Sequence, residues 1–304
     1  MSIKKILILI LCFLFFIKEA AFASAGGTTV FEFLKIPSTA SHAALAGMPG
    51  FSSDSASSSP AMLGFVESPS FAATYAAYFQ DVSFQAASFA FPYKNLIFNL
   101  SYSGFNYGNI DGYSSDPSGN YVFTGTFGAD DSSFGIGVGY NVTQWLSVGA
   151  GLKYARQNID ASSISGFALN ASAVYLPDAN WYAVGGFENV GPNVEGYSMP
   201  ASVYAGGYSY YEQYNILYGG EIKVYSGNLV FLKVAGEYDF KEILFFRLGY
   251  NISLTNSNDT LGEWYQRNLT AGFGISYGFF SLDYAWLPFG DLGSTSMVTL
   301  QISF

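Results

Sequence analysis

The feature that most constrains this chain is an alternation of apolar and polar residues with period two, which recurs from about residue 71 to the C-terminus. In the final stretch, Val298, Leu300 and Ile302 are apolar, while Thr299 and Gln301 between them are polar. Successive side chains of a β-strand point to opposite faces, so each such stretch predicts a strand with one apolar face. An exposed soluble sheet edge of this kind would promote aggregation, so the apolar face needs a partner.

The same pattern repeats in "LVFLKVAGEYDF" (229–240), "EILFFRLGYNISL" (242–254) and "NLTAGFGISY" (268–277). Turn-forming residues separate the strands. They occupy 92–95, 113–120, 176–180, 225–228 and 255–263. We predict fourteen strands of about 10 residues each between residues 71 and 304, with no helix among them.

Two architectures fit this pattern: a large soluble sandwich or barrel, and a transmembrane barrel. The chain is 50% hydrophobic and only 11% charged, whereas a soluble domain is about a quarter charged. Strands of about 10 residues also suit a tilted membrane-spanning strand. Because every backbone group must be paired in lipid, such a sheet has to close. We therefore expect an all-β fold, a closed antiparallel transmembrane β-barrel.

The N-terminus predicts an exported protein. Lys4 and Lys5 precede a short apolar run at 6–17, and small residues follow it, which is the pattern of a secretory signal peptide over residues 1–23. The alternative is an uncleaved anchor, but the run is too short to span a bilayer. Cys12 is the only cysteine and lies in this segment, so we expect no disulfide, thiolate metal site or cysteine nucleophile in the processed chain.

Charge and histidine content narrow the functions further. The formal net charge is −10, which is unfavourable for nucleic-acid binding. His42 is the only histidine, so multi-histidine metal sites are excluded and a Ser-His-Asp triad is unlikely to form. "GIGVGY" (135–140) has no helix after it, and its glycines are interpreted as relieving crowding inside a barrel. Asp130 and Asp131 are interpreted as solvated rather than as a cation site. We expect no catalytic residues, no cofactor and no metal.

The polar alternates of the predicted strands would face the lumen. The charged members of this set are Lys153, Glu221, Lys223, Lys233, Glu237, Arg247 and Asp283. Both signs occur, so these side chains could pair across neighbouring strands and solvate the interior. The alternative is that they form a selective binding site.

Residues 24–70 do not alternate, and they are predicted to form a plug inside the barrel, which would occupy residues 71–304. An Ala-rich stretch after Pro37 predicts a short helix with Ser38 near its N-cap. Plug candidates are Phe33, Leu34, Asp54 and Pro60. The alternative is a loose periplasmic tail.

Several motifs resemble those of the PorV/PorQ family of outer-membrane proteins, which are related to FadL-type barrels. They are "SLDYAWLPFGDLGSTSMVTLQISF" (281–304), "ISGFALNASAVYL" (164–176), "FENVGPNV" (187–194), "MPASVYAGGYS" (199–209) and "FLKIPSTASHAALAGMPGF" (33–51). The most specific of them is "PFGDLG" (288–293). This resemblance implies a fourteen-stranded FadL-like barrel with a plug, placed in the bacterial outer membrane and surrounded by its lipid.

The resemblance implies two functions and leaves them open. One is passage or binding of hydrophobic small molecules through the plugged lumen, which we take as the leading hypothesis. The other is a component of type IX secretion that binds cargo or partner proteins. A purely structural outer-membrane protein is the third possibility, and none of the three is an enzyme.

Overall fold

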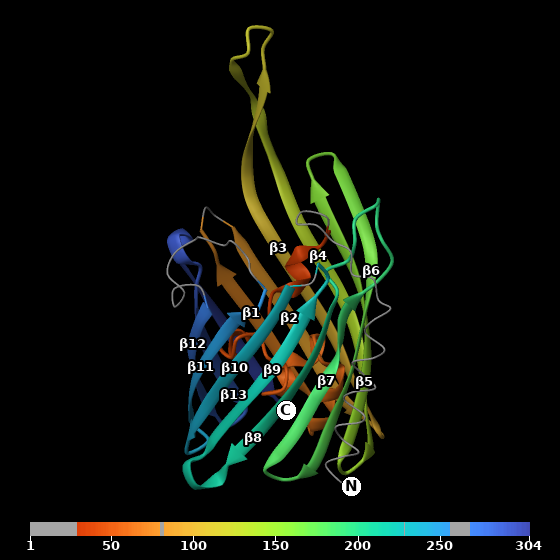
Figure 1. Ribbon diagram of the computed structural model, residues 1–304, viewed down its shortest axis with the longest axis vertical. Helices are drawn as coiled ribbons and strands as arrows, with labels where there is room; N and C mark the ends of the chain where they lie inside the picture. Colours follow the sequence, from red (N-terminus) through yellow and green to blue (C-terminus); the bar gives the residue numbers. More distant parts are fainter. Residues whose placement is uncertain (1–28, 80–81, 228, 256–267) are drawn as a thin grey trace.

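The computed structural model describes residues 29–79, 82–227, 229–255 and 268–304. The predicted signal peptide with Cys12, and most of the predicted turn at 255–263, lie outside the described residues. Within the described part, a closed β-barrel surrounds a compact N-terminal segment (Figure 1).

The barrel wall consists of fourteen antiparallel strands, as the sequence predicts. They are β1 (Ser70–Ala77), β2 (Ser83–Tyr93), β3 (Leu96–Ser115), β4 (Tyr121–Thr143), β5 (Leu146–Ile159), β6 (Ser162–Asp178), β7 (Trp181–Val190), β8 (Ser202–Tyr211), β9 (Ile216–Tyr225), β10 (Leu229–Phe240), β11 (Leu244–Ser253), β12 (Leu269–Tyr277), β13 (Phe280–Pro288) and β14 (Ser294–Ser303). Each strand pairs with the next along the chain, and β14 pairs with β1, with Phe71 opposite Ile302. Closure therefore pairs the C-terminal strand on both sides.

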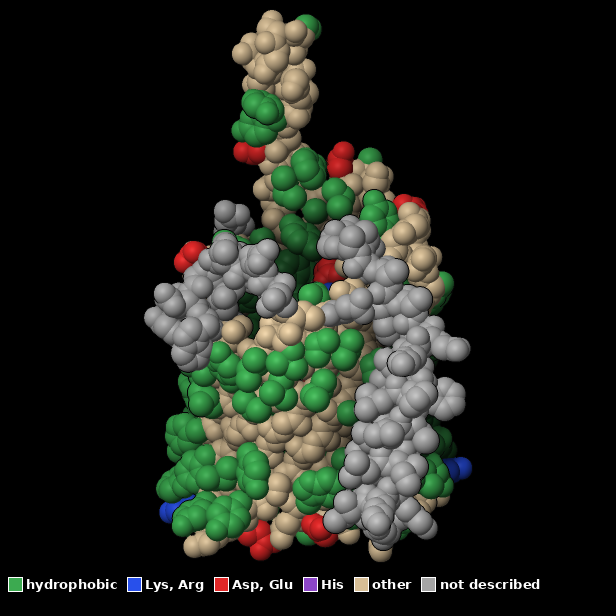
Figure 2. Space-filling model, viewed as in Figure 1, with side chains coloured by type: hydrophobic (Ala, Val, Ile, Leu, Met, Phe, Trp, Pro, Cys, Tyr) green, Lys and Arg blue, Asp and Glu red, His purple; other side chains and the backbone are tan. Residues whose placement is uncertain are grey.

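The alternation in the sequence separates the two faces of this wall. Apolar side chains at the outward positions are about half exposed, for example Phe246 (52%), Leu248 (56%) and Leu300 (44%). Hydrophobic side chains spread over the visible barrel surface, while acidic and basic side chains gather toward its ends (Figure 2). An apolar outer surface of this extent is typical of a wall in contact with lipid.

The two ends of the barrel differ. At one end, which we call the short-turn end, neighbouring strands are joined by a few residues, as between β2 and β3. At the opposite, long-loop end, β3 and β4 continue as a narrow hairpin far beyond the other strands (Figure 1). Pairing with β2 ends at Asn106 and pairing with β5 ends at Ala129. Residues 107–128 therefore form a two-stranded ribbon, and the predicted length of about 10 residues is wrong for β3 and β4, which have 20 and 23.

Residues 29–66, which we call the plug, fold inside the barrel. The plug contains the 3-10 helices η2 (Glu32–Lys35), η3 (Ser53–Ser57) and η4 (Pro60–Phe65) and one short α-helix, α2 (Ala40–Ala44). The N-cap of α2 is Thr39, the residue after Ser38, and its hydroxyl accepts from the backbone N–H of His42. None of the helices formed by the described residues is long and apolar enough to cross a membrane. Two further 3-10 turns, η5 (Glu212–Tyr214) and η6 (Gly290–Leu292), join strands at the barrel ends.

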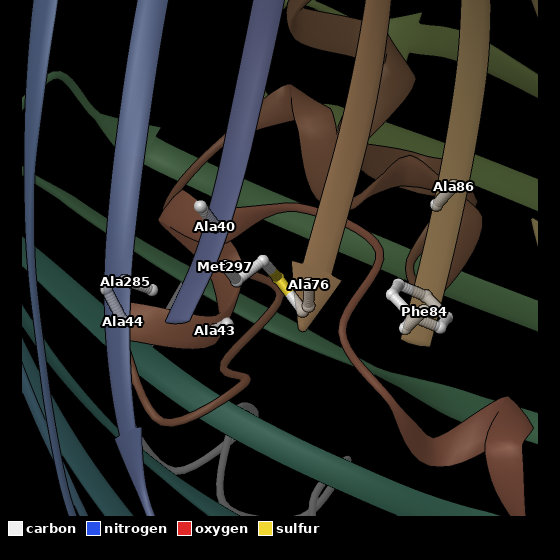
Figure 3. Close-up of a cluster of buried hydrophobic side chains, with 8 residues drawn as sticks. All are labelled: Ala40, Ala43, Ala44, Ala76, Phe84, Ala86, Ala285 and Met297. Carbon is white, nitrogen blue, oxygen red and sulfur yellow. The ribbon is translucent and has the colours of Figure 1, made fainter. Parts of the chain in front are cut away.

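Small side chains let the plug lie directly against the wall. Ala40, Ala43 and Ala44 of α2 are almost fully buried and pack with Ala285 of β13 and Met297 of β14 (Figure 3). Such a surface allows close packing against the curved interior of a barrel. The Ala-rich sequence of α2 is thus explained by its contact with the wall.

Candidate functional site

The plug backbone is held by side chains of the wall. These hydrogen bonds join Ala40 N to Thr299 Oγ1 (2.8 Å), Thr270 Oγ1 to Ala44 O (2.8 Å), Ala61 N to Ser172 Oγ (2.8 Å), Ser147 Oγ to Ala61 O (2.8 Å) and Asn170 Nδ2 to Ser57 O (2.7 Å). Buried backbone groups must be paired, and the short helices of the plug pair only some of its own. Side chains of the wall provide partners for these other backbone groups, so the plug is an integral part of the lumen.

Glycines of the strands leave room for the plug. A Cβ added to Gly139 of β4 would lie 2.6 Å from Leu63 Cβ, and one added to Gly149 of β5 would overlap the backbone of Pro60. A side chain at either position would collide with η4, which explains glycine within these strands. For Gly139, this agrees with the interpretation that the glycines of "GIGVGY" relieve crowding.

A cavity of about 500 Å³ lies between the plug and strands β9–β13. Aromatic side chains line much of it, among them Tyr78, Phe105, Phe231 and Phe289. The rings of Tyr78 and Phe105 lie 5.4 Å apart, and those of Tyr78 and Phe289 lie 5.8 Å apart. Burial raises the pKa of Tyr78 to about 12, so its hydroxyl stays neutral. The size is typical of small-molecule sites, which have volumes of about 300–1,000 Å³.

A buried ion pair borders this cavity. Lys223 Nζ of β9 lies 2.8 Å from Glu188 Oε2 of β7, and both side chains are only 6% exposed. The same ammonium lies 5.5 Å from the ring centroid of Tyr204 and 5.4 Å from that of Tyr225. Lys223 is thus enclosed by a carboxylate and two aromatic faces, an arrangement that stabilises a buried cation.

Lys233 of β10 also lines the cavity but is bonded differently. Its ammonium donates to the plug carbonyl Gly47 O at 3.3 Å, and the residue is 6% exposed. Glu221 stands opposite it on β9. The Glu221 carboxylate accepts instead from the hydroxyl of Tyr208, at 3.3 Å. No carboxylate of the described residues lies within salt-bridge distance of Lys233.

A second ionic cluster lies closer to the short-turn end. Arg247 of β11 donates to Glu237 of β10 at 2.5 Å and also to Asp283 of β13. To reach Asp283, the guanidinium passes over β12 at Gly274, where an added Cβ would overlap the Asp283 carboxylate. Glycine at this position therefore allows one arginine to connect three strands.

The plug contributes its own polar groups. Asp54 accepts a hydrogen bond from Ser41. His42 is 5% exposed, and burial lowers its pKa from 6.5 to about 4, so its ring is neutral. Over the described part of the chain, no three His, Cys, Asp or Glu side chains come close enough together to hold a metal ion.

The structure brings most of the predicted lumen residues together in these two clusters. Lys223 and Lys233 line the cavity, Glu221 lies beside them, and Glu237, Arg247 and Asp283 form the second cluster. Lys153 of β5 lies outside the cavity lining but close enough to Glu188 and Lys223 to interact with them electrostatically, and it donates to Asn189 Oδ1 at 3.3 Å. Of the predicted plug residues, Phe33, Leu34 and Pro60 are buried and Asp54 is partly exposed.

The structure corrects one interpretation and adds residues that the sequence analysis missed. Asp131 is only 2% exposed and accepts from Tyr107 OH at 2.8 Å, so it is not simply solvated. Tyr204 and Tyr208 are fully buried on the inner face of β8. Their spacing of four in "MPASVYAGGYS" places them on the same face as Ser202, a signal that period two could have revealed.

Comparisons with known proteins agree with the fold. No protein-family model matches the chain, and no curated protein sequence matches it. Among solved structures, the toluene transporter TbuX of Ralstonia pickettii has a TM-score of 0.65 at 14% identity, over 90% of this chain and 100% of that one. The toluene transporter TodX of Pseudomonas putida gives 0.65 at 12% identity, over 87% and 96%. CymD, a monoaromatic hydrocarbon channel, gives 0.60 at 11% identity, over 89% and 98%. These similarities establish the fold, a FadL-like closed barrel.

Proposed function

We propose that this chain is an outer-membrane channel that binds small hydrophobic molecules and passes them through its plugged lumen. In this proposal, the outward apolar face contacts lipid and the long-loop end faces the exterior, since outer-membrane barrels have short periplasmic turns and longer outer loops.

The observation that carries the proposal is the cavity between the plug and β9–β13. It has the volume of a small-molecule site, and aromatic rings line it (Phe105, Phe231 and Phe289 among them). A purely structural barrel does not need an aromatic cavity of this size beside its plug. The shared fold with proteins named as toluene transporters and monoaromatic hydrocarbon channels supports the same conclusion by analogy.

The test is binding of n-propylbenzene to the purified full chain in lipid nanodiscs. Phe231→Asp places a carboxylate in the aromatic wall, so we expect its affinity to fall at least about tenfold, since burying an unpaired charge is costly. Phe123→Asp is the matched control, because Phe123 is 55% exposed on the ribbon and far from the cavity lining. Absence of binding to the unmodified chain would rule out the proposed function.

A PorV/PorQ-type secretion component is the second candidate, supported by the position of the family-like motif. Residues 287–293 end β13 and form η6 at the long-loop end, and Leu287, Pro288 and Phe289 line the cavity. In this reading, the motif would contribute to a surface for partner proteins. A search of the same genome for proteins with a type IX C-terminal signal domain discriminates, because a shuttle without cargo has no function.

A further inference from the structure

A second part of the lumen, along the inner face of β1–β5, is lined by small and hydroxyl-bearing side chains. Three small cavities of about 30, 20 and 10 Å³ lie between this part of the wall and the plug. We call the three cavities together the polar seam. The wall residues that line it include Ala72, Thr74, Ser88, Asn99, Ser101 and Ser133. The seam shares no wall residue with the cavity beside β9–β13, only Ile36 and Ser58 of the plug.

The three cavities are neighbours and follow the wall from one end toward the other. The two larger ones meet at Ala72 of β1 and Ser88 of β2, which line both and lie opposite each other. Toward the short-turn end, the seam reaches Ser70, the first residue of β1. Toward the long-loop end, it reaches Ser103, three positions before the last residue of β3 that pairs with β2. The seam therefore extends from near one rim of the barrel to near the other.

Two carboxylate oxygens along this line have no partner within the described part of the protein. One is Asp54 Oδ1, in the lining of the cavity nearest the short-turn end. The other is Asp131 Oδ1, which belongs to the next inner position of β4 after Ser133 toward the long-loop end. The second oxygens of these carboxylates accept from Ser41 and Tyr107. Buried acceptors that lack a protein partner are normally satisfied by ordered water.

The size of the seam selects water over larger solutes. A cavity needs about 10–15 Å³ to hold a water molecule, so the two larger cavities hold one or two each and the smallest is at the limit. A hydrated ion does not fit in such a space. Lys153 also lines two of the cavities, where Glu188 offsets part of its charge and Lys223 adds to it. A fixed positive charge beside a narrow passage opposes the entry of cations.

We propose that the polar seam carries a file of water molecules and lets water, but not ions, cross the barrel. Hydroxyl and carboxylate oxygens of the lining replace part of the hydrogen bonding that each molecule leaves behind in bulk water, as a narrow water path requires. This activity goes beyond the proposed function, because the seam and the cavity beside β9–β13 use different residues of the wall.

The test is osmotic water permeability, measured by stopped-flow light scattering on vesicles that contain the full chain. We expect this permeability to exceed that of protein-free vesicles. Ala72→Leu fills the junction of the two larger cavities, so the protein-dependent part should fall at least about fivefold if water moves in a narrow file. Ala73→Leu is the matched control, because the next residue of the same strand faces the opposite side of the wall and should leave the permeability unchanged.

A second variant keeps the test decisive if Ala72→Leu does not fold, which urea titration in vesicles checks. Ser88→Ala removes a hydroxyl from the junction without adding volume, and we expect it to lower the protein-dependent permeability by about twofold. Equal permeability of Ala72→Leu and Ala73→Leu would overturn the inference. An unmodified chain no more permeable than protein-free vesicles, or an unchanged permeability in Ser88→Ala when Ala72→Leu is unfolded, would overturn it as well.

Ion exclusion and the proposed function are separated by two further measurements. The unmodified chain should show no KCl conductance above background in planar bilayers, and a measurable conductance would refute the exclusion of ions. Binding of n-propylbenzene to Ala72→Leu should stay within about twofold of the unmodified chain, since this variant does not alter the lining beside β9–β13. Water flow that depends on the seam, without binding of n-propylbenzene, would support the inference and refute the proposed function alone.

Discussion

The wall and the plug of this molecule are built by opposite means. The wall pairs its own backbone, strand to strand, around a closed circle of fourteen. The plug pairs part of its backbone in short helical turns and other parts with side chains such as Thr270, Ser172 and Asn170 that the wall directs inward. The backbone pairing of the wall is therefore independent of the plug, whereas that of the plug depends in part on the wall.

The charged side chains of the lumen differ in the same way: one group joins strands of the wall to each other, and the other joins the wall to the plug. Arg247 binds Glu237 and Asp283, all three from strands, and so reinforces the wall. Lys233 donates to Gly47 of the plug and joins the wall to the plug instead. Damage to the Arg247 cluster should destabilise the barrel, whereas loss of the Lys233 contact should change only how the plug is held.

The largest effect is expected from removing the arginine of the wall cluster. Arg247→Met leaves two buried carboxylates without a cation, and breaking a buried pair in this way costs about 3–5 kcal/mol. The free energy of unfolding, measured by urea titration in vesicles, should fall by that amount. Arg156→Met on β5 is the control, because Arg156 is exposed and its guanidinium only contacts Asn158. If Glu237→Gln and Asp283→Asn added to Arg247→Met restored no stability, the charge explanation would be wrong.

Whether the outward face of the wall contacts lipid is tested by placing a charged side chain on it. Leu248 of β11 is 56% exposed, and Leu248→Arg should cost about 2–4 kcal/mol if that exposure is to hydrocarbon. The same change on a water-exposed strand is nearly neutral, so Phe123→Arg on the ribbon provides the comparison. Unfolding in vesicles measures both, and equal stability of the two variants would contradict a lipid-facing wall.

The strands of the wall could be predicted from the sequence because the face that each side chain occupies depends only on its position within its own segment. Period two decides which face each residue occupies, and fourteen alternating segments predict fourteen strands. The long ribbon was not predicted, although its tip lies within the predicted turn at 113–120. The length of the ribbon depends on where β2 and β5 stop pairing with β3 and β4, which is a property of neighbouring segments.

The site was less accessible to prediction than the wall. Alternation indicated that Lys233 and Arg247 would share the inner face, but not which partners each would find. The bond from Arg247 to Asp283 depends on a glycine in the intervening strand, and that from Lys233 to Gly47 spans 186 positions of sequence. Contacts of this kind arise from the closed shape of the barrel and leave no periodic signal.

The fit between the wall and the plug is tested by adding a single methyl group. Gly149→Ala would force the new Cβ against Pro60 and Ala61, and overpacking of this kind costs about 1–3 kcal/mol. The plug is held less rigidly than the hydrogen-bonded wall, so we expect the plug rather than the wall to move. This movement would open the lumen and raise ion conductance in planar bilayers while the barrel stays folded. Gly128→Ala is the matched control, since a Cβ there meets nothing within 4 Å. Equal conductance of the two variants would mean that the plug does not fill the lumen at this level.

The smallest effect concerns the acid sensitivity of the plug. Burial lowers the pKa of His42 to about 4, below its ordinary value of 6.5, although Asp54 and Glu188 face it and raise that pKa in part. Lys223 and Lys233 act in the same direction as burial. Because the released plug binds a proton more readily than the docked plug, docking loses stability as the pH falls from about 6.5 toward 4. Between about pH 7 and about pH 5.5, the loss attributable to His42 should be about 1 kcal/mol. Hydrogen exchange of the plug amides at the two pH values measures it, with His42→Gln as the comparison. The unmodified chain should lose more protection on acidification than the variant, and an equal loss in both would show that docking does not lower the pKa of His42.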